Sequence, residues 1–356
     1  MAAVWQVRLM DTAGDLVAVL DDYEGFSLSR HVNTAGSYAF RMDGNSDKCA
    51  LFDLDGMVEF WRRDEAYGID WYCEFGAFHR TGVYYMTADD RIKYQSEGRG
   101  YADLLARRIV ADASGSAEAA KSGPAETVAK EYVDEQCGPS AGARAMTGLS
   151  IEADGADGNT VTLGRAYRNV LEVVQEIASI GGGDFAVIRT AAATFEFRWY
   201  DGQLGTDRTA TVVFALGRGN MAQPDLRLSR ASEVNAVLVG GQGEGAARAT
   251  EWRTDAVRIA DSTWNRQELF FNASNEPLAA GLQAKGDALL EQGRPKNSLR
   301  FEVLQVPGCL YGQDYFLGDL VTARFLDIQA TKKVQSVSFD VDSAGEKCKV
   351  EMADVG

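Results

Sequence analysis

Alternating hydrophobic and polar positions dominate the first hundred or so residues and predict short β-strands. Trp5, Val7 and Leu9 alternate with polar neighbours, and residues 27–31 and 37–42 flank a turn-forming Asn-Thr-Ala-Gly sequence. Alternation on both sides of such a turn is typical of a β-hairpin. Short strands at this spacing favour a barrel or a sandwich over a fold of alternating strands and helices.

Helical periodicity appears in the middle of the chain. Apolar residues recur on one face from Pro124 to Val133, and proline is favoured in the first turn of a helix. A second helical pattern covers 170–180 and ends at three consecutive glycines. A shorter one lies within 101–109, whereas the small and polar residues 113–123 predict a loop.

The last third of the chain alternates again and predicts strands, for example with Val337, Phe339 and Val341 on one face. One further helix is predicted from Glu276-Pro277 to Gly293. The sequence therefore predicts a mainly β protein with an α+β insertion. We expect a β domain with a short helix over residues 1–110, a mixed α/β domain over 111–204, and a second β domain with one helix at about 276–293 over 205–356.

Length and charge narrow the class of protein. The 356 residues exceed what one core usually organises, which is consistent with several domains. The chain holds 36 basic and 52 acidic residues, and this excess of acid argues against binding to the phosphates of double-stranded nucleic acid. No apolar run approaches the roughly 20 residues that span a bilayer, and the N-terminus lacks the pattern of a signal peptide. We expect a soluble, acidic, globular protein.

The cysteines and histidines do not suggest a metal site. The sequence contains no Cys-x-x-Cys pair, and its only imidazoles are His31 and His79. We expect reduced thiols, partly buried, in a protein that folds in a cytoplasm. The five cysteines are Cys49, Cys73, Cys137, Cys309 and Cys348.

Three glycine- or acid-rich segments resemble binding motifs but lack the required context. Residues 217–222 match a dinucleotide-binding fingerprint, yet Pro224 prevents the helix that such a site needs. Residues 240–245 lack the lysine of a phosphate-binding loop and predict a hairpin tip. Asp154, Asp157 and Asn159 do not have the alternating ligands of a calcium loop and predict a turn.

No catalytic arrangement is recognisable. Neither histidine lies in a known nucleophile motif, and a histidine packed in or beside a strand is the simpler interpretation. A glycosidase needs two carboxylates at a defined separation, and the sequence singles out no such pair. The acidic pairs Asp53/Asp55 and Asp89/Asp90 are expected to be solvated turn residues.

The most specific motif lies near the C-terminus, where residues 311–321 read YGQDYFLGDLV. This segment resembles the YGxDYxLGDxV signature of a family of siphovirus tail-tip hub proteins, found chiefly in phages of actinobacteria. Shorter stretches in the same order also match, at 20–23, 36–40, 100–108, 169–180, 212–214, 235–241 and 266–268. The signature residues are Tyr311, Gly312, Asp314, Tyr315, Gly318 and Asp319.

The resemblance implies a fold and a function. The family is similar to baseplate hub proteins and to the N-terminal part of tail-associated lysins, which implies two hub-type antiparallel β-barrel domains beside the mixed domain. It also implies a homotrimer that joins the six-fold distal tail ring to a three-fold tip and surrounds the DNA exit channel. The implied partners are the distal tail protein ring, the tape-measure C-terminus and tip or fibre proteins, with no membrane insertion, no cofactor and no catalysis.

Within the signature, we expect a structural role. Gly318 permits a tight turn, and the Asp319 carboxylate can accept hydrogen bonds from nearby main-chain amides. The protein is expected in the virion tail tip after assembly in the host cytoplasm.

Two alternative functions stay open. One is a cell-wall glycosidase or peptidase with its site in residues 111–204. The other is a module that binds host carbohydrate through Trp199, Trp252 or Trp264.

Overall fold

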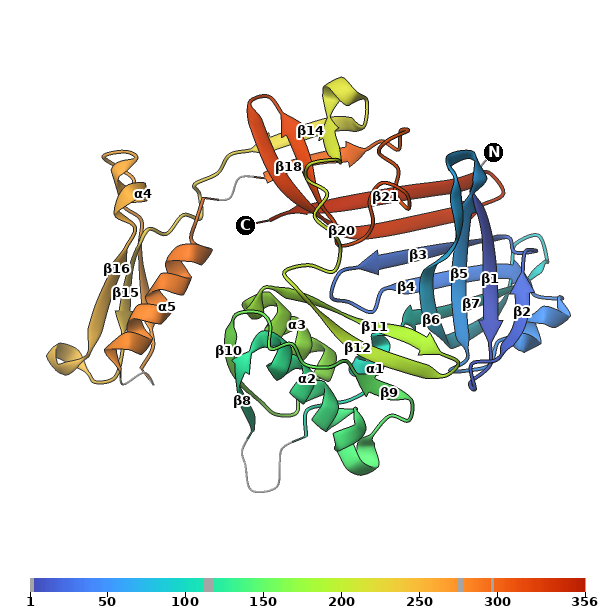
Figure 1. Ribbon diagram of the computed structural model, residues 1–356, viewed down its shortest axis with the longest axis horizontal. Coiled ribbons are helices and arrows are strands. Elements are labelled where there is room, and N and C mark those ends of the chain that lie inside the picture. Colours follow the sequence, from blue (N-terminus) through green and yellow to red (C-terminus); the bar gives the residue numbers. More distant parts are fainter. Residues whose placement is uncertain (1–2, 112–117, 275–277, 296–297, 356) are drawn as a thin grey trace. The chain divides into compact units, whose positions relative to one another are not determined.

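The computed structural model describes residues 3–111, 118–274, 278–295 and 298–355. It divides into two compact units, one formed by 1–222 with 302–356 and the other by 223–301. Strands predominate in several sheets, and the helices are few (Figure 1). The predicted mainly β fold class with an α+β insertion is confirmed.

The largest sheet, in the first unit, takes strands from both ends of the chain. Its order is β13-β19-β20-β3-β4-β7-β6-β5-β1-β2, with β21 paired to β20. Figure 1 shows the C-terminal strand β20 beside the N-terminal strand β3, with β21 on the other side of β20. The strands are β1 (Val4–Met10), β2 (Leu16–Leu20), β3 (Gly25–His31), β4 (Ser37–Asp43), β5 (Met57–Asp64), β6 (Ile69–Met86), β7 (Ile92–Gly100), β13 (Val213–Ala215), β19 (Leu320–Phe325), β20 (Ile328–Asp342) and β21 (Gly345–Asp354).

The aromatic core explains why both ends of the chain meet in this sheet. The Trp5 ring lies edge-on to Phe339 of β20, with ring centroids 5.1 Å apart. Phe26 of β3 packs against both Trp5 and Phe60, at 5.2 and 4.9 Å. These rings are nearly or fully buried. Aromatic side chains bury large apolar areas, so the N-terminal strands lose much of their core without β20.

Two expectations about this region stay predictions. Among the described residues no ladder joins β2 to β13, so closure into β-barrels is not established. The division into domains 1–110, 111–204 and 205–356 also stays a prediction.

The mixed region has its own helices and small sheets in the first unit. Helices α2 and α3 pack against each other, and their apolar faces share a core with Tyr101 and Phe78. The helical predictions over 124–133 and 170–180 are confirmed, and the pattern within 101–109 yields the short α1. The elements are α1 (Asp103–Ala106), α2 (Ala125–Gln136), α3 (Val170–Gly181), β8 (Ala119–Pro124), β9 (Leu149–Ile151), β10 (Thr160–Arg165), β11 (Gly183–Ala191) and β12 (Thr194–Asp201).

One loop prediction was wrong in part. Residues 119–124 form β8, which pairs antiparallel with β10. The small residues of β8 have little strand propensity, so the ladder with a strand about 40 residues away decides their conformation. Residues 113–117 of the same predicted loop lie outside the described residues.

The second unit is a small sheet with one long helix. Val237 and Val239 of the central strand β15 pack against Leu282 and Leu290 of α5. The predicted helix is confirmed and is followed by Gly293, whereas Glu276 and Pro277 lie outside the described residues. None of the described helices has the length and apolar character needed to cross a membrane. The elements of this sheet and its helices are β15 (Ala236–Gly240), β16 (Thr250–Thr254), α4 (Ala256–Ala260), β17 (Glu268–Asn272) and α5 (Ala279–Gln292). At the boundary between the units, β14 (Met221–Arg227) pairs with β18 (Ser298–Val303) in a separate two-stranded sheet.

The end of α3 gives a test of the fold. Gly182 has a φ of +77°, and its N–H donates to the carbonyl of Ala178 at 3.0 Å. A Gly182→Ala substitution should lower the free energy of unfolding by about 1–2 kcal/mol, because a left-handed conformation strains residues with a Cβ. Gly123→Ala is the control, since its Cβ would meet only Val128, at 3.9 Å. Equal denaturation midpoints for the two variants would contradict a left-handed conformation at Gly182.

Candidate functional site

The signature residues lie together in the loop between β18 and β19. Tyr311, Gly312, Tyr315, Gly318 and Asp319 are buried, and Asp314 is half-buried. The loop closes on itself, since the Gly312 N–H donates to the Tyr315 carbonyl at 3.0 Å. The Asp314 carboxylate accepts from the Leu310 N–H at 2.8 Å. The structure therefore brings together all six residues that the sequence singled out.

Asp319 is the most highly connected carboxylate of this loop. Its Oδ1 accepts from the Thr206 N–H at 2.6 Å. Its Oδ2 accepts from the Phe316 N–H at 2.9 Å and from Nε of Arg208 at 2.6 Å. The residue is only 2% exposed. A buried carboxylate with this many donors holds the loop and the segment around Thr206 in a fixed geometry.

The same loop is bonded to strand β20. The Gly318 N–H donates to the Val334 carbonyl, and the Val334 N–H donates to the Asp319 carbonyl, both at 2.9 Å. Gly318 has a φ of +88°, and a Cβ there would lie 2.7 Å from that of Leu204. Glycine is therefore required both by the conformation and by the lack of space.

Tyr311 connects the loop to the N-terminal sheet. Its hydroxyl donates to Oε1 of Glu74 on β6 at 3.0 Å, and the same oxygen accepts from Nη1 of Arg30 on β3 at 2.6 Å. Burial and the neighbouring Glu74 carboxylate raise the pKa of Tyr311 well above its usual value. Burial opposes the charge on Arg30, but Glu74 and Tyr311 together favour it, and the pKa of the guanidinium is raised. Arg30 is therefore charged at all accessible pH values.

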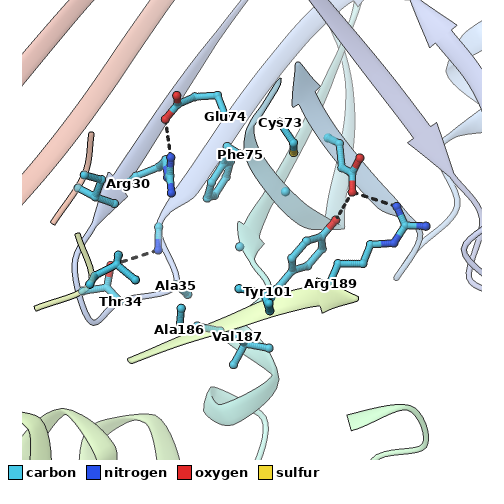
Figure 2. Close-up of a pocket in the computed structure, with 18 of the residues that line it drawn as sticks. Arg30, Thr34, Ala35, Cys73, Glu74, Phe75, Tyr101, Ala186, Val187 and Arg189 are labelled. Atoms are coloured by element: carbon cyan, nitrogen blue, oxygen red, sulfur yellow. Dashed lines mark hydrogen bonds and ion pairs between the residues drawn. The ribbon is translucent and has the colours of Figure 1, made fainter. Parts of the chain in front are cut away.

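A cleft of about 650 Å³ lies beside this ion pair (Figure 2). In Figure 2, Phe75 and Cys73 of β6 lie across the cleft from Ala186 and Val187 of β11. Thr34, in the turn between β3 and β4, also lines the cleft. All of these elements belong to the first unit.

Glu59 forms the second charged group of the cleft. Its Oε1 accepts from the Tyr101 hydroxyl at 3.0 Å and from Nη1 of Arg189 at 2.9 Å. Its Oε2 accepts from Nε1 of Trp61 at 2.9 Å. Burial and this carboxylate raise the pKa of Tyr101 well above its usual value. Glu59 therefore has both oxygens engaged within the protein.

Nothing in the spacing of the sequence singled out these cleft residues. Glu59 and Glu74 lie in strands whose neighbours are apolar, and both are buried. An acidic residue within an apolar strand is the signal that would have identified them, because buried carboxylates need partners.

His79 and its hydroxyl partner lie where no substrate can reach them. Nδ1 of His79 lies 2.8 Å from the Ser96 hydroxyl, which contacts Tyr38 at the same distance. Ser96 is 0% exposed and His79 is 2% exposed. Burial lowers the pKa of His79. The predicted packed histidine therefore describes His79, whereas His31 is exposed and contacts Ser29.

The other motif segments adopt the predicted turns. Residues 217–222 form a short 3-10 turn and the start of β14 instead of a nucleotide-binding helix. Gly240 ends β15, and 241–245 lie in the connection to β16. The Asp154 carboxylate accepts from the Ala156 N–H and from the Thr127 hydroxyl. Among the described residues no group of three His, Cys, Asp or Glu side chains is arranged to hold a metal ion.

The tryptophans and cysteines differ in exposure. Trp199 is buried and cannot serve as a stacking platform, whereas Trp252 and Trp264 are 46% and 87% exposed. All five thiols are free. Cys49, Cys137 and Cys309 are buried, Cys348 is half-buried, and Cys73 is exposed and lines the cleft.

Comparison with solved structures identifies the fold. A tail protein from Neisseria meningitidis MC58 matches with a TM-score of 0.59 and 14% identity over 99% of this chain and 96% of its own. The 43 kDa tail protein of prophage MuSo2 from Shewanella oneidensis matches with a TM-score of 0.60 and 12% identity, over 99% of this chain and 98% of its own. Prophage tail protein gp18 from Listeria monocytogenes EGD-e matches with a TM-score of 0.58 and 9% identity, over 99% of this chain and 95% of its own. The fold is therefore the one found in these tail proteins.

Comparison of the sequence with family models identifies the family. No curated protein matches this chain by sequence. One family model, that of the Siphovirus ReqiPepy6 Gp37-like protein, matches residues 6–352. This range contains the whole signature loop and nearly all of the main sheet. The chain belongs to the Siphovirus ReqiPepy6 Gp37-like family of phage tail proteins.

Proposed function

We propose that this tail protein is the trimeric hub of a siphovirus tail tip and has a structural rather than an enzymatic role. Three copies would form a ring that joins the six-fold distal tail ring to a three-fold tip around the DNA exit channel. Its neighbours would be the distal tail protein, the tape-measure C-terminus and tip or fibre proteins. The family match over residues 6–352 is the observation that carries this function.

One free sheet edge supports association with further copies. Strand β2 pairs only with β1 among the described strands. Leu16, Val17 and Val19 on β2 are 59%, 42% and 42% exposed. An apolar edge strand exposed in this way is prone to pair with another chain.

A second free edge lies in β6. The ladder between β5 and β6 ends at Phe78, so residues 80–86 pair only with β7. All seven of these residues are exposed, and they include Val83, Tyr84, Tyr85 and Met86. The two edges differ in sequence, and contact between different edges of successive copies is the heterologous kind that can close a ring.

The acidity of the chain suits a DNA channel. The formal net charge is −16 at neutral pH. Negative charge on the inner surface of a ring would repel DNA phosphates and prevent them from binding during passage.

We further propose that the signature holds the hub subunit together. Asp319 and Tyr311 connect the loop to β20, β6 and the segment around Thr206 through buried hydrogen bonds. None of these contacts leaves an accessible group for catalysis, which supports a structural role.

The signature gives a prediction on stability. Asp319→Asn replaces one accepting carboxylate oxygen by an amide NH₂ group, which cannot accept from the N–H donors that it faces. The free energy of unfolding should therefore fall by about 3 kcal/mol. Asp314→Asn is the matched control, because the remaining amide oxygen can still accept from Leu310. Chemical denaturation of both variants measures the difference, and equal stabilities would show that Asp319 does not hold the loop.

The free edges give a prediction on assembly. The purified chain should sediment as a trimer at high concentration, and Val17→Lys should shift it to monomer because a charge disrupts an apolar edge. Val257→Lys, at a 79% exposed position in the second unit, is the control that should leave the trimer intact.

Met86→Pro tests the second edge. The Thr87 N–H donates to the Arg91 carbonyl, so strand alternation directs the Met86 N–H away from β7. Proline there should remove a donor from the free edge while keeping the β6–β7 ladder. A trimer that survives both Val17→Lys and Met86→Pro would contradict the edge assignment, and a monomer at every concentration would contradict self-assembly.

A further inference from the structure

The cleft beside Arg30 contains an unpaired strand edge. Strand β11 pairs with β12 on one side only, and residues 185–192 line the cleft without interruption. We propose that this cleft binds an extended segment of another polypeptide, which adds a strand to β11 and places a carboxylate against Arg30.

Hydrogen bonding shows which main-chain groups of β11 face the cleft. The Phe185 N–H donates to Oδ1 of Asn33 at 2.8 Å, so it points away from β12. Alternation along a strand gives Val187 and Arg189 the same direction. No hydrogen bond described for this unit occupies the main-chain groups of Val187 on that side.

An unpaired edge beside a cavity favours one kind of ligand. Main-chain N–H and C=O groups that lose water need new partners, and an extended peptide supplies both in alternation. Asn33 already occupies the Phe185 end of the edge. The remaining positions, from Val187 onward, are therefore the ones available to an added strand.

The charged groups of the cleft favour an acidic residue in that peptide. Arg30 uses Nη1 for Glu74, its side chain is 28% exposed, and the structure describes no partner for its other N–H groups. The two carboxylates of the cleft cannot accept a hydrogen bond from a ligand, because Glu59 has both oxygens engaged and Oε2 of Glu74 is buried away from solvent. The cleft thus offers charged donors, and a guanidinium suits a carboxylate.

The dimensions and the apolar lining fit a short strand. A volume of about 650 Å³ lies within the range of specific ligand sites. At about 3.3 Å per residue, a segment of four or five residues spans roughly 13–17 Å. Ala35, Phe75 and Val187 line the cleft and can contact the apolar side chains of such a segment.

Selection from a displayed library of random octapeptides tests this site whatever the natural partner is. The immobilised full chain should enrich peptides that carry one acidic residue at a fixed position among apolar residues. The most enriched peptide should slow hydrogen exchange in residues 187–190, because an added strand protects the free part of the β11 edge.

Two substitutions test the two parts of the proposed binding mode, the carboxylate contact with Arg30 and the strand added to β11. Arg30→Lys keeps an ion pair with Glu74 but loses the planar donors, and it should weaken the enriched peptide at least tenfold. Arg198→Lys, on β12 outside the cleft, is the matched control and should leave affinity unchanged. Val187→Pro removes a donor that faces the cleft and should also weaken binding at least tenfold.

Several outcomes would overturn the site. They are the absence of enriched peptides, binding that is equal in the parent chain and Arg30→Lys, or binding without slower exchange in β11. The trimeric state is measured separately by sedimentation, so failure of peptide binding and failure of ring assembly are distinguishable.

Discussion

The antiparallel ladder between β3 and β20 is the interaction on which the rest of the first unit depends. It pairs residues 25–31 with 336–342 and places Phe339 in an aromatic core with Trp5 and the N-terminal strands. Burial of these rings supplies much of the favourable free energy, and the ladder satisfies the main-chain groups that burial removes from water. The chain leaves this unit after residue 222 and returns at 302, so its two ends must meet before the unit is complete.

The signature loop and the cleft follow from that pairing. Once β20 lies beside β3, the loop before β19 is held against β6, where Tyr311 meets Glu74 and Arg30. The same ion pair forms one side of the cleft, and β11 forms the other. Motif, core and cleft therefore share a small set of buried polar contacts. The two exposed edges, β2 and residues 80–86, lie at the ends of ladders in this sheet and stay available for other copies.

Local patterns predicted the elements better than their partners. The apolar face of α3 and the glycine that follows it were evident from spacing, and so was the alternation of Trp5, Val7 and Leu9. The pairing of β3 with β20 was not, because more than 300 residues separate the partners and alternation records only which face is buried. Strand β8 was missed for the same reason. The signature was evident from its resemblance to a family motif. The ion-pair partners Glu59, Glu74 and Arg189 could be identified only from the fold, because their partners are distant in the sequence.

Electron cryomicroscopy of the purified chain at high concentration tests the central claim most directly, namely that this tail protein acts through surfaces that join copies of itself. We expect a ring with three-fold symmetry, in which β2 of one copy lies beside residues 80–86 of the next and acidic side chains face the bore. Single subunits at every concentration, or a ring whose contacts leave both edges exposed to solvent, would contradict it.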